Sequence, residues 1–211
     1  MTPLYRLDAD AAAIIRHFGA QPGNDPWAGG QVVPGSFAPV LTEGREFVAG
    51  PGDGRQPRRL VPRLWGVPPP PAAGYGARPI LSVANPDSPF WIGNLRNREF
   101  RCLIPATGFM VWSSQTDYEG RRLRHWLAPA GAPLFAFAGL WRDSEVPSFA
   151  MLTMPASAQL RELGCMRMPL VLPLAGAACD LWLRAGWDRA QALLTSGEAP
   201  QLRLLESLPR G

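Results

Sequence analysis

The stretch RCLIPATGFMVW, residues 101–112, predicts the centre of the fold. It has the pattern of a strand, a tight turn at Ala106, Thr107 and Gly108, and a second strand that ends on large apolar residues. Such a segment resembles the lip of a cleft. Its second half, however, carries Val111 and Trp112, so it contains no group that exchanges a proton near neutral pH.

Similar short patterns extend from this segment in both directions. Candidate strands cover residues 36–42, 46–49, 58–65, 79–84, 99–104, 109–113, 122–128, 133–141 and 147–153. The content of 24 Pro and 22 Gly favours short strands and turns over a helical bundle. A capped helix is predicted within residues 8–18, and helical spacing returns at 156–163 and 175–195. The sequence therefore predicts a β-rich core with one early helix and a group of late helices, in a single domain over residues 1–211.

Composition restricts the class of protein. Apolar residues make up 46% of the 211 and charged residues 18%, which is typical of a globular chain. The net charge is +4 and every basic residue is Arg. This indicates either a partner with phosphates or carboxylates, or a bias toward Arg codons. The three cysteines have no C-x-x-C spacing, so we expect neither a disulfide framework nor a zinc site, and no other cofactor. Without a signal peptide or an apolar span, a soluble cytoplasmic protein is expected.

No general catalytic motif is present. The only histidines are His17, in the early helix, and His125, in RRLRHWL on a predicted strand. Neither belongs to a recognisable nucleophile signature, and we find no phosphate loop, no H-E-x-x-H and no acidic metal cluster. A packing or surface role is the simpler interpretation for His17.

Two basic stretches suggest a nucleic-acid surface. Arginines recur in NLRNREFRC (94–102) and EGRRLRHW (119–126), and Trp65, Trp91, Trp112 and Trp126 lie in or near these stretches. Arginines for phosphates and aromatic rings for unstacked bases are typical of a single-strand groove. In the alternative interpretation, the tryptophans belong to the core and the arginines to solvated strand faces.

The order of five segments resembles the SOS response-associated peptidase family, the abasic-site processing proteins. These segments are RRLVPRLWG, RCLIPATGFMVW, PLFAFAGLW, FAMLTMPAS and CMRMPLVL, and the match covers about residues 1–173. The family pattern contains W-G, then N-x-R, then R-C-[LI]-[IV]-P-A-x-G-[FWY]-[FY]-E-W, and later H-x-R-M-P. The R-C-L-I-P-A-x-G-F and R-M-P-L-V-L pieces are the specific part of this match.

The resemblance implies an α+β domain with a barrel-like, mostly antiparallel β core, a few peripheral helices and a groove for single-stranded DNA. In the family, removal of the first Met exposes a Cys that captures the ring-opened sugar of an abasic site. An Asn, a Glu and a His line the pocket, and the Arg of N-x-R contacts DNA. The same groups are thought to release the initiator Met, which explains the word peptidase.

This sequence departs from the family at each of those positions. Thr2 replaces the Cys, Ser82 the Asn, Ala84 the Arg, Val111 the Glu and Cys165 the His. A hydroxyl is a far poorer nucleophile than a thiol, since it lacks an accessible ionised form. With neither a carboxylate nor an imidazole at these positions, no obvious group remains to move a proton.

Other family positions are retained. Trp65 matches the W-G tryptophan, Thr153 the threonine that ends a strand, and Arg167 the arginine of R-M-P, so a residual pocket is expected. The first hypothesis is a catalytically degenerate pseudoenzyme that at most binds single-stranded DNA weakly. The second is an active crosslinking enzyme or peptidase with unusual residues. The third is an interaction scaffold without nucleic acid, with Pro68–Pro71 on its surface. The sequence does not determine an oligomeric state.

Overall fold

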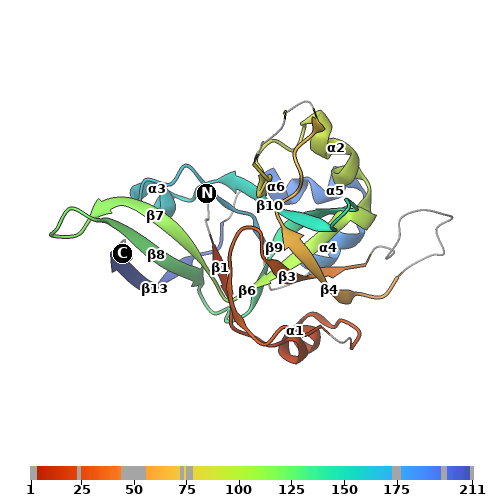
Figure 1. Ribbon diagram of the computed structural model, residues 1–211, viewed down its shortest axis with the longest axis horizontal. Helices are drawn as coiled ribbons and strands as arrows, with labels where there is room; N and C mark the ends of the chain where they lie inside the picture. Colours follow the sequence, from red (N-terminus) through yellow and green to blue (C-terminus); the bar gives the residue numbers. More distant parts are fainter. Residues whose placement is uncertain are drawn as a thin grey trace.

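The computed structural model describes residues 4–22, 25–43, 56–71, 74, 78–172, 177–195 and 199–209. These residues form two mostly antiparallel sheets with short helices around them, so the α+β class is confirmed (Figure 1). The strand predicted at 46–49 and the position of Thr2 lie outside the described residues, as does part of the proline-rich segment.

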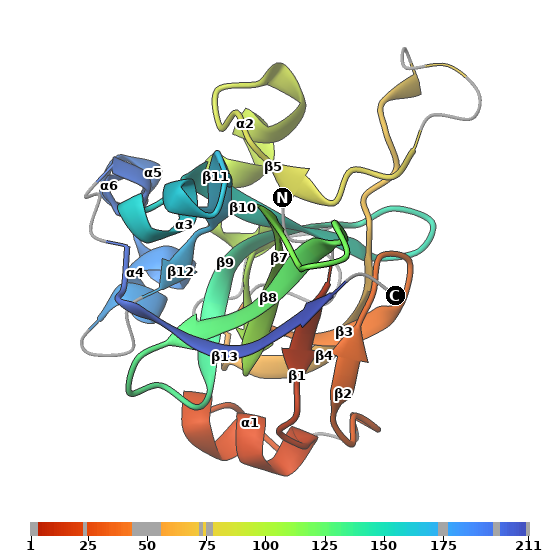
Figure 2. The same ribbon diagram turned by 90° about the vertical axis from the view of Figure 1, so that its left-hand side faces the viewer.

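One sheet has five strands in the order β13-β8-β7-β1-β2, and it faces the viewer in Figure 2. Its strands are β1 (Tyr5–Leu7), β2 (Gly30–Val32), β7 (Gly108–Thr116), β8 (Arg122–Pro129) and β13 (Leu202–Pro209). The register of β7 and β8 places Val111 opposite His125, and that of β8 and β13 places His125 opposite Ser207. Residues that are directly opposed share one face of a sheet.

The larger sheet follows the order β11-β10-β4-β3-β6-β9-β12, and β10 also pairs with β9 and with β5. Its strands are β3 (Phe37–Thr42), β4 (Arg59–Trp65), β5 (Ser82–Val83), β6 (Arg101–Ala106), β9 (Phe135–Arg142), β10 (Ser148–Pro155), β11 (Arg167–Pro169) and β12 (Val171–Leu172). The alternation of Phe and Ala in β9 places buried residues on both faces, as expected. A Cβ atom on Gly139 would lie only 2.7 Å from Ile104, so β6 and β9 approach closely.

The helices surround the two sheets. The early helix α1 (Ala11–Phe18) begins where the Asp10 carboxylate accepts a hydrogen bond from the Ala13 amide, and it ends at Gly19 in the left-handed conformation. The late helices are α3 (Ala158–Glu162), α4 (Ala178–Arg184), α5 (Trp187–Ala190) and α6 (Ala192–Thr195). Figure 2 places α1 and α2 (Pro89–Arg96) at opposite ends of the molecule.

The predicted succession of strand, tight turn and strand around Thr107 is confirmed, but the two strands belong to different sheets. The strands β6 and β7 follow each other directly, but β6 pairs with β3 and β9, whereas β7 pairs with β1 and β8. Thr107 is therefore the point where the chain passes from one sheet to the other. Its amide donates to the Arg6 carbonyl at 2.8 Å and its hydroxyl to Asp8 at 3.1 Å, so β1 fixes this corner.

Several other boundaries differ from the predictions. The segment 79–84 forms a strand only at β5, and Arg98–Phe100 is a 3-10 helix (η2) rather than the start of β6. Helix α2 was not predicted, although Ser88 caps it and Pro89 occupies its first turn, a recognisable start signal. Strand β13 was also not predicted, because Leu202–Pro209 lacks a regular apolar alternation: most of its residues are exposed at the sheet edge.

Candidate functional site

Arg167, Thr153 and Ser82 are brought together by the pairings of β10. Strand β5 lies parallel to β10, with Ser82 opposite Met151, while β11 runs antiparallel on β10. The Thr153 hydroxyl donates to the Val83 carbonyl at 3.2 Å, and Arg167 Nε donates to that hydroxyl at 3.0 Å. Arg167 Nη2 donates to the carbonyls of Thr153 at 2.6 Å and Ala84 at 3.0 Å.

These bonds fix the guanidinium of Arg167 at the end of β5. A guanidinium has five N–H groups, and those on Nε and Nη2 are used for protein oxygens. The two N–H groups of Nη1 make no hydrogen bond within the described residues. They are therefore available to an anionic or carbonyl ligand, since Arg167 is only half-buried.

Trp65 contributes to the wall of this region and not to its surface. It is buried, its indole Nε1 donates to the Leu81 carbonyl at 3.1 Å, and its ring stacks on Phe149 at 6.3 Å. Tyr5 packs against it edge-on at 5.3 Å. A ring enclosed in this way cannot stack on a base, but it holds the segment that leads into β5.

Val111 and Cys165 lie on neighbouring segments in a closed environment. The segment that carries Cys165 runs along β7: the Ser114 amide donates to the Leu163 carbonyl at 2.8 Å, and the Cys165 thiol donates to the Trp112 carbonyl at 3.4 Å. Val111 is 3% exposed and Cys165 is 8% exposed. Burial raises the pKa of the Cys165 thiol, so it is a neutral and weakly nucleophilic group at neutral pH.

His125 is the functional candidate that sequence reasoning missed. It is 5% exposed and lies directly across from Val111, on the same face of the five-stranded sheet. Its Nδ1 is 2.7 Å from the hydroxyl of Ser207 on β13, while its Nε2 is buried and has no hydrogen-bond partner among the described residues. Burial lowers the pKa of the imidazole. We call Val111, His125 and Cys165 the β7 site.

Strand pairing places an imidazole, that of His125, opposite Val111, which the positions of the family pattern did not indicate. The alternation of Leu123, His125 and Leu127 gave a signal that His125 faces inward on a strand. Its neighbour on β7 depends on the register between two strands, which the sequence pattern did not reveal.

The basic stretches separate into a buried part and an exposed part. Trp91 and Trp126 are buried like Trp65, and Arg6 covers Trp126 with its guanidinium 4.0 Å from the ring. These three rings belong to the interior, so the core interpretation is correct for them, while Trp112 is half-buried. The exposed arginines of the two stretches are Arg96, Arg98, Arg121 and Arg122.

Arg101 is completely buried and holds two helix ends. Its Nε donates to the Leu95 carbonyl at 2.7 Å, and its Nη1 donates to the carbonyls of Trp182 at 3.0 Å and Ala185 at 2.8 Å. Burial, together with the nearby charge of Arg98, lowers the pKa of Arg101 to about 10, so it remains charged at neutral pH. This cation is a structural clamp between β6, α2 and α4 and is not a DNA contact.

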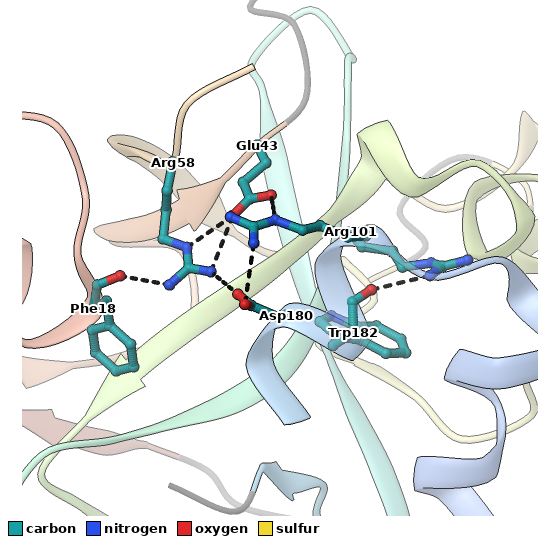
Figure 3. Close-up of polar contacts among 7 residues, drawn as sticks. Phe18, Glu43, Arg58, Arg101, Asp180 and Trp182 are labelled. Atoms are coloured by element: carbon teal, nitrogen blue, oxygen red, sulfur yellow. Dashed lines mark hydrogen bonds and ion pairs between the residues drawn. The ribbon is translucent and has the colours of Figure 1, made fainter. Parts of the chain in front are cut away.

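A partly buried cluster of charged side chains lies beside this clamp (Figure 3). The Glu43 carboxylate accepts hydrogen bonds from Arg58 at 3.1 Å and from two nitrogens of Arg184, and Asp180 accepts one from Arg58 at 2.6 Å. Arg58 also donates to the Phe18 carbonyl at the end of α1. We call Glu43, Arg58, Asp180 and Arg184 the ionic cluster. A cavity of about 530 Å³ adjoins the ionic cluster. Because both guanidiniums already pair with carboxylates, we interpret the cluster as a structural link between secondary-structure elements.

Within the described residues, no three His, Cys, Asp or Glu side chains converge in a way that could hold a metal ion. In the same part of the chain, no helix has the length and apolar character needed to cross a membrane.

Comparison with known proteins identifies relatives of this arrangement. The family model for SOS response associated peptidases (SRAP) matches residues 1–206. A protein of known structure from Bordetella bronchiseptica is 19% identical, with a TM-score of 0.69 over 97% of this chain and 99% of its own. A phage-related protein from the same organism is 16% identical, with a TM-score of 0.68 over 96% and 93%.

A protein from Bacteroides thetaiotaomicron is 15% identical, with a TM-score of 0.66 over 97% of this chain and 92% of its own. At such identities the likeness concerns the fold. The comparison with curated proteins found no match.

Proposed function

Because the chain belongs to the SOS response associated peptidase family, we propose that it is a catalytically degenerate member that binds single-stranded DNA weakly, without a lasting crosslink to abasic sites. The family is associated with DNA damage and abasic-site processing. The proposal concerns which part of that activity this chain retains.

The observation that carries the proposal is the closure of the β7 site. Val111 stands where the resemblance places a carboxylate, and it is buried among apolar residues. Cys165 stands where an imidazole would be, with its thiol bonded to a backbone carbonyl and its pKa raised by burial. Neither side chain can activate a nucleophile by removing its proton. The imidazole of His125 lies opposite Val111 and is only 5% exposed, so it does not take the place of either group at the surface of the site.

Weak binding of single-stranded DNA is supported by the distribution of positive charge. The net charge is +4, and Arg96 and Arg98 are exposed at the end of α2 and in η2. Arg167 is fixed through Nε and Nη2, which leaves its Nη1 donors without a hydrogen bond among the described residues. The buried tryptophans remove the aromatic platforms that would strengthen binding, and Ala84 carries no charge. Phosphate contacts therefore account for most of the proposed affinity.

The test is a titration of a fluorescently labelled single-stranded oligonucleotide by anisotropy at low salt, repeated at increasing salt. We expect weak binding that decreases with salt, with a logarithmic slope of about −0.7 per phosphate contact in a single strand. Arg167→Gln should weaken binding and reduce that slope. Arg16→Gln is the matched control, because Arg16 is exposed on α1, at the end of the molecule opposite α2. An absence of binding at low salt contradicts the proposal.

A further inference from the structure

A cavity of about 670 Å³ is formed by the end of β10, the start of α3 and helix α6. Met154 and Pro155 line it from β10, and Leu194 and Thr195 line it from α6. None of the residues of the β7 site lines this cavity. Its volume is within the range of about 300–1,000 Å³ that is typical of small-molecule sites.

The inner wall of the cavity is apolar. Met154 is only 8% exposed, and Leu194 and Ala199 are partly buried against the hydrophobic core. Pro155 and Ala158 are exposed, so the cavity opens to solvent. A ligand with an apolar body is therefore stabilised here, because the body leaves water when it covers this wall.

Arg161 is the charged side chain that lines the cavity among the described residues. It lies on α3, and its Nη1 donates to the Ala156 carbonyl at 2.7 Å, which fixes the guanidinium beside the cavity. Within the described part of the chain, its Nε and Nη2 make no hydrogen bond and the guanidinium makes no ion pair. Two neighbouring nitrogens of a guanidinium can donate side by side to both oxygens of one carboxylate.

A neutral donor lies next to this cation. The Ser157 hydroxyl also lines the cavity, and its oxygen accepts a hydrogen bond from the Leu160 amide at 3.4 Å. A hydroxyl that accepts one bond still has its own proton to donate. Arg161 and Ser157 together present N–H and O–H donors beside an apolar wall.

The cavity of about 530 Å³ beside the ionic cluster does not offer the same chemistry. It is lined by Arg58 and Arg184, but both guanidiniums already pair with Glu43 and Asp180. A new anion there would have to displace a carboxylate of the protein. At Arg161, by contrast, no Asp or Glu of the described residues lines the cavity.

We propose that the cavity beside Arg161 binds a small monocarboxylate with an apolar body, such as an aryl- or alkyl-substituted acid. The carboxylate oxygens contact Nε and Nη2 of Arg161, and the apolar body packs on Met154 and Leu194. Inorganic phosphate carries the required charge but has no group that covers the apolar wall. The proposal does not depend on the proposed binding of DNA.

The test titrates the full-length protein, labelled with [¹³C-methyl]methionine, with 3-phenylpropionate and follows the methyl signals by NMR. The chain has 6 Met, and Met154→Leu assigns the signal inside the cavity. We expect the Met154 signal to shift until binding saturates, while the signal of Met110, on β7 outside the cavity, stays unchanged.

Two related compounds separate the contributions of charge and apolar body. 3-Phenylpropionamide has the same body without the charge, and acetate has the charge without the ring. Each should bind at least roughly tenfold more weakly than 3-phenylpropionate, because each lacks one of the two contacts.

Three variants test the named contacts. Arg161→Gln should weaken binding of 3-phenylpropionate roughly tenfold or more, because charge-assisted hydrogen bonds are lost. Arg16→Gln is the matched control, since Arg16 is exposed on α1 and does not line the cavity. Ala158→Trp should prevent binding although Arg161 is present, because an indole at this exposed lining position occupies the space.

Several results would overturn the inference. One is a Met154 signal that does not shift with 3-phenylpropionate, or that shifts equally with the amide. Another is equal binding by the unmodified protein and Arg161→Gln. A third is a Met154 shift with inorganic phosphate or an intact single-stranded oligonucleotide but not with 3-phenylpropionate, which would make Arg161 a phosphate contact. The anisotropy titration of DNA is separate, so failure of one proposal leaves the other standing.

Discussion

The ionic cluster and the β7 site differ in how their polar groups are paired. In the ionic cluster, Glu43 and Asp180 pair with two guanidiniums. The neighbouring Arg101 donates to three carbonyls, while its Nη2 is buried without a partner among the described residues. In the β7 site, Val111 and Cys165 are apolar or neutral, and His125 keeps one nitrogen unpaired. Stability in the first region therefore depends on paired charges, whereas the second region is apolar or neutral and contains one buried imidazole, that of His125.

The largest effect is expected for Arg101→Met. This change leaves the buried carbonyls of Leu95, Trp182 and Ala185 without their charged donor, and charge-assisted bonds contribute more than neutral ones. We expect the free energy of unfolding to fall by about 3 kcal/mol or more, measured by urea denaturation. Arg98→Met is the control, since Arg98 is exposed, and it should change stability by less than about 0.5 kcal/mol. A similar small loss for both variants would mean that the clamp contributes little.

Glu43→Gln should be the next most destabilising change. The Glu43 side chain is only 7% exposed and accepts hydrogen bonds from Arg58 and Arg184, so its neutralisation leaves two cations near each other. A loss of about 2 kcal/mol is expected, below the range for fully buried pairs because Arg184 is partly exposed. Asp180→Asn, at a half-exposed side chain, should cost less than about 1 kcal/mol. If both variants lose the same stability, Glu43 is not the centre of the cluster.

Val111→Glu tests whether the β7 site is closed. A new carboxylate in this apolar position should reduce stability by roughly 1–3 kcal/mol. It should not restore an adduct with abasic DNA, because Thr2 and Cys165 are unchanged. Since His125 is directly opposite, the carboxylate should raise the pKa of the imidazole, which NMR titration can follow. An unchanged melting temperature would indicate that this site is open to water.

The smallest effect is the pH dependence caused by His125. Burial lowers the pKa of His125 in the folded protein below its ordinary value of about 6.5, so the unfolded chain binds the proton more readily. The contribution of His125 to stability is complete above about pH 6.5 and is lost progressively as the pH falls toward the lower folded pKa. The difference in the free energy of unfolding between the protein and His125→Phe should therefore become smaller as the pH falls. Denaturation curves of both proteins over a range of pH measure this difference. A parallel pH dependence of the two proteins would contradict this account.

The strands nearest the opening segment were well predicted because their signals are local. The apolar alternation of β9 and the Pro and Gly residues that separate β6 to β10 depend only on neighbouring residues. Helix α1 was predicted for the same reason, because Asp10 and Gly19 mark its two ends. The passage of the chain from one sheet to the other at Thr107 was not predicted. The residues of a tight turn are the same whether the two flanking strands pair with each other or belong to different sheets.

The parts that could not be predicted depend on partners that are distant in sequence. Arg101 looked like a surface arginine in a basic stretch, but its acceptors include carbonyls of α4 that lie 81 and 84 residues later. The surroundings of His125 could not be predicted, because its neighbours are Val111 on β7 and Ser207 on β13, an edge strand that the sequence pattern did not reveal. The grouping of Ser82, Thr153 and Arg167 followed from the family resemblance, and their hydrogen bonds required the pairings of β10.

The most direct measurement incubates the purified protein with a single-stranded oligonucleotide that contains a natural abasic site, with and without borohydride. The products are separated on denaturing gels, and mass spectrometry determines whether Met1 is present. The account predicts no heat-stable adduct without borohydride, and at most an imine that borohydride traps through the N-terminal amine, because Thr2 cannot close a thiazolidine. A heat-stable adduct formed without borohydride would contradict the account and identify Thr2 or Cys165 as a working nucleophile.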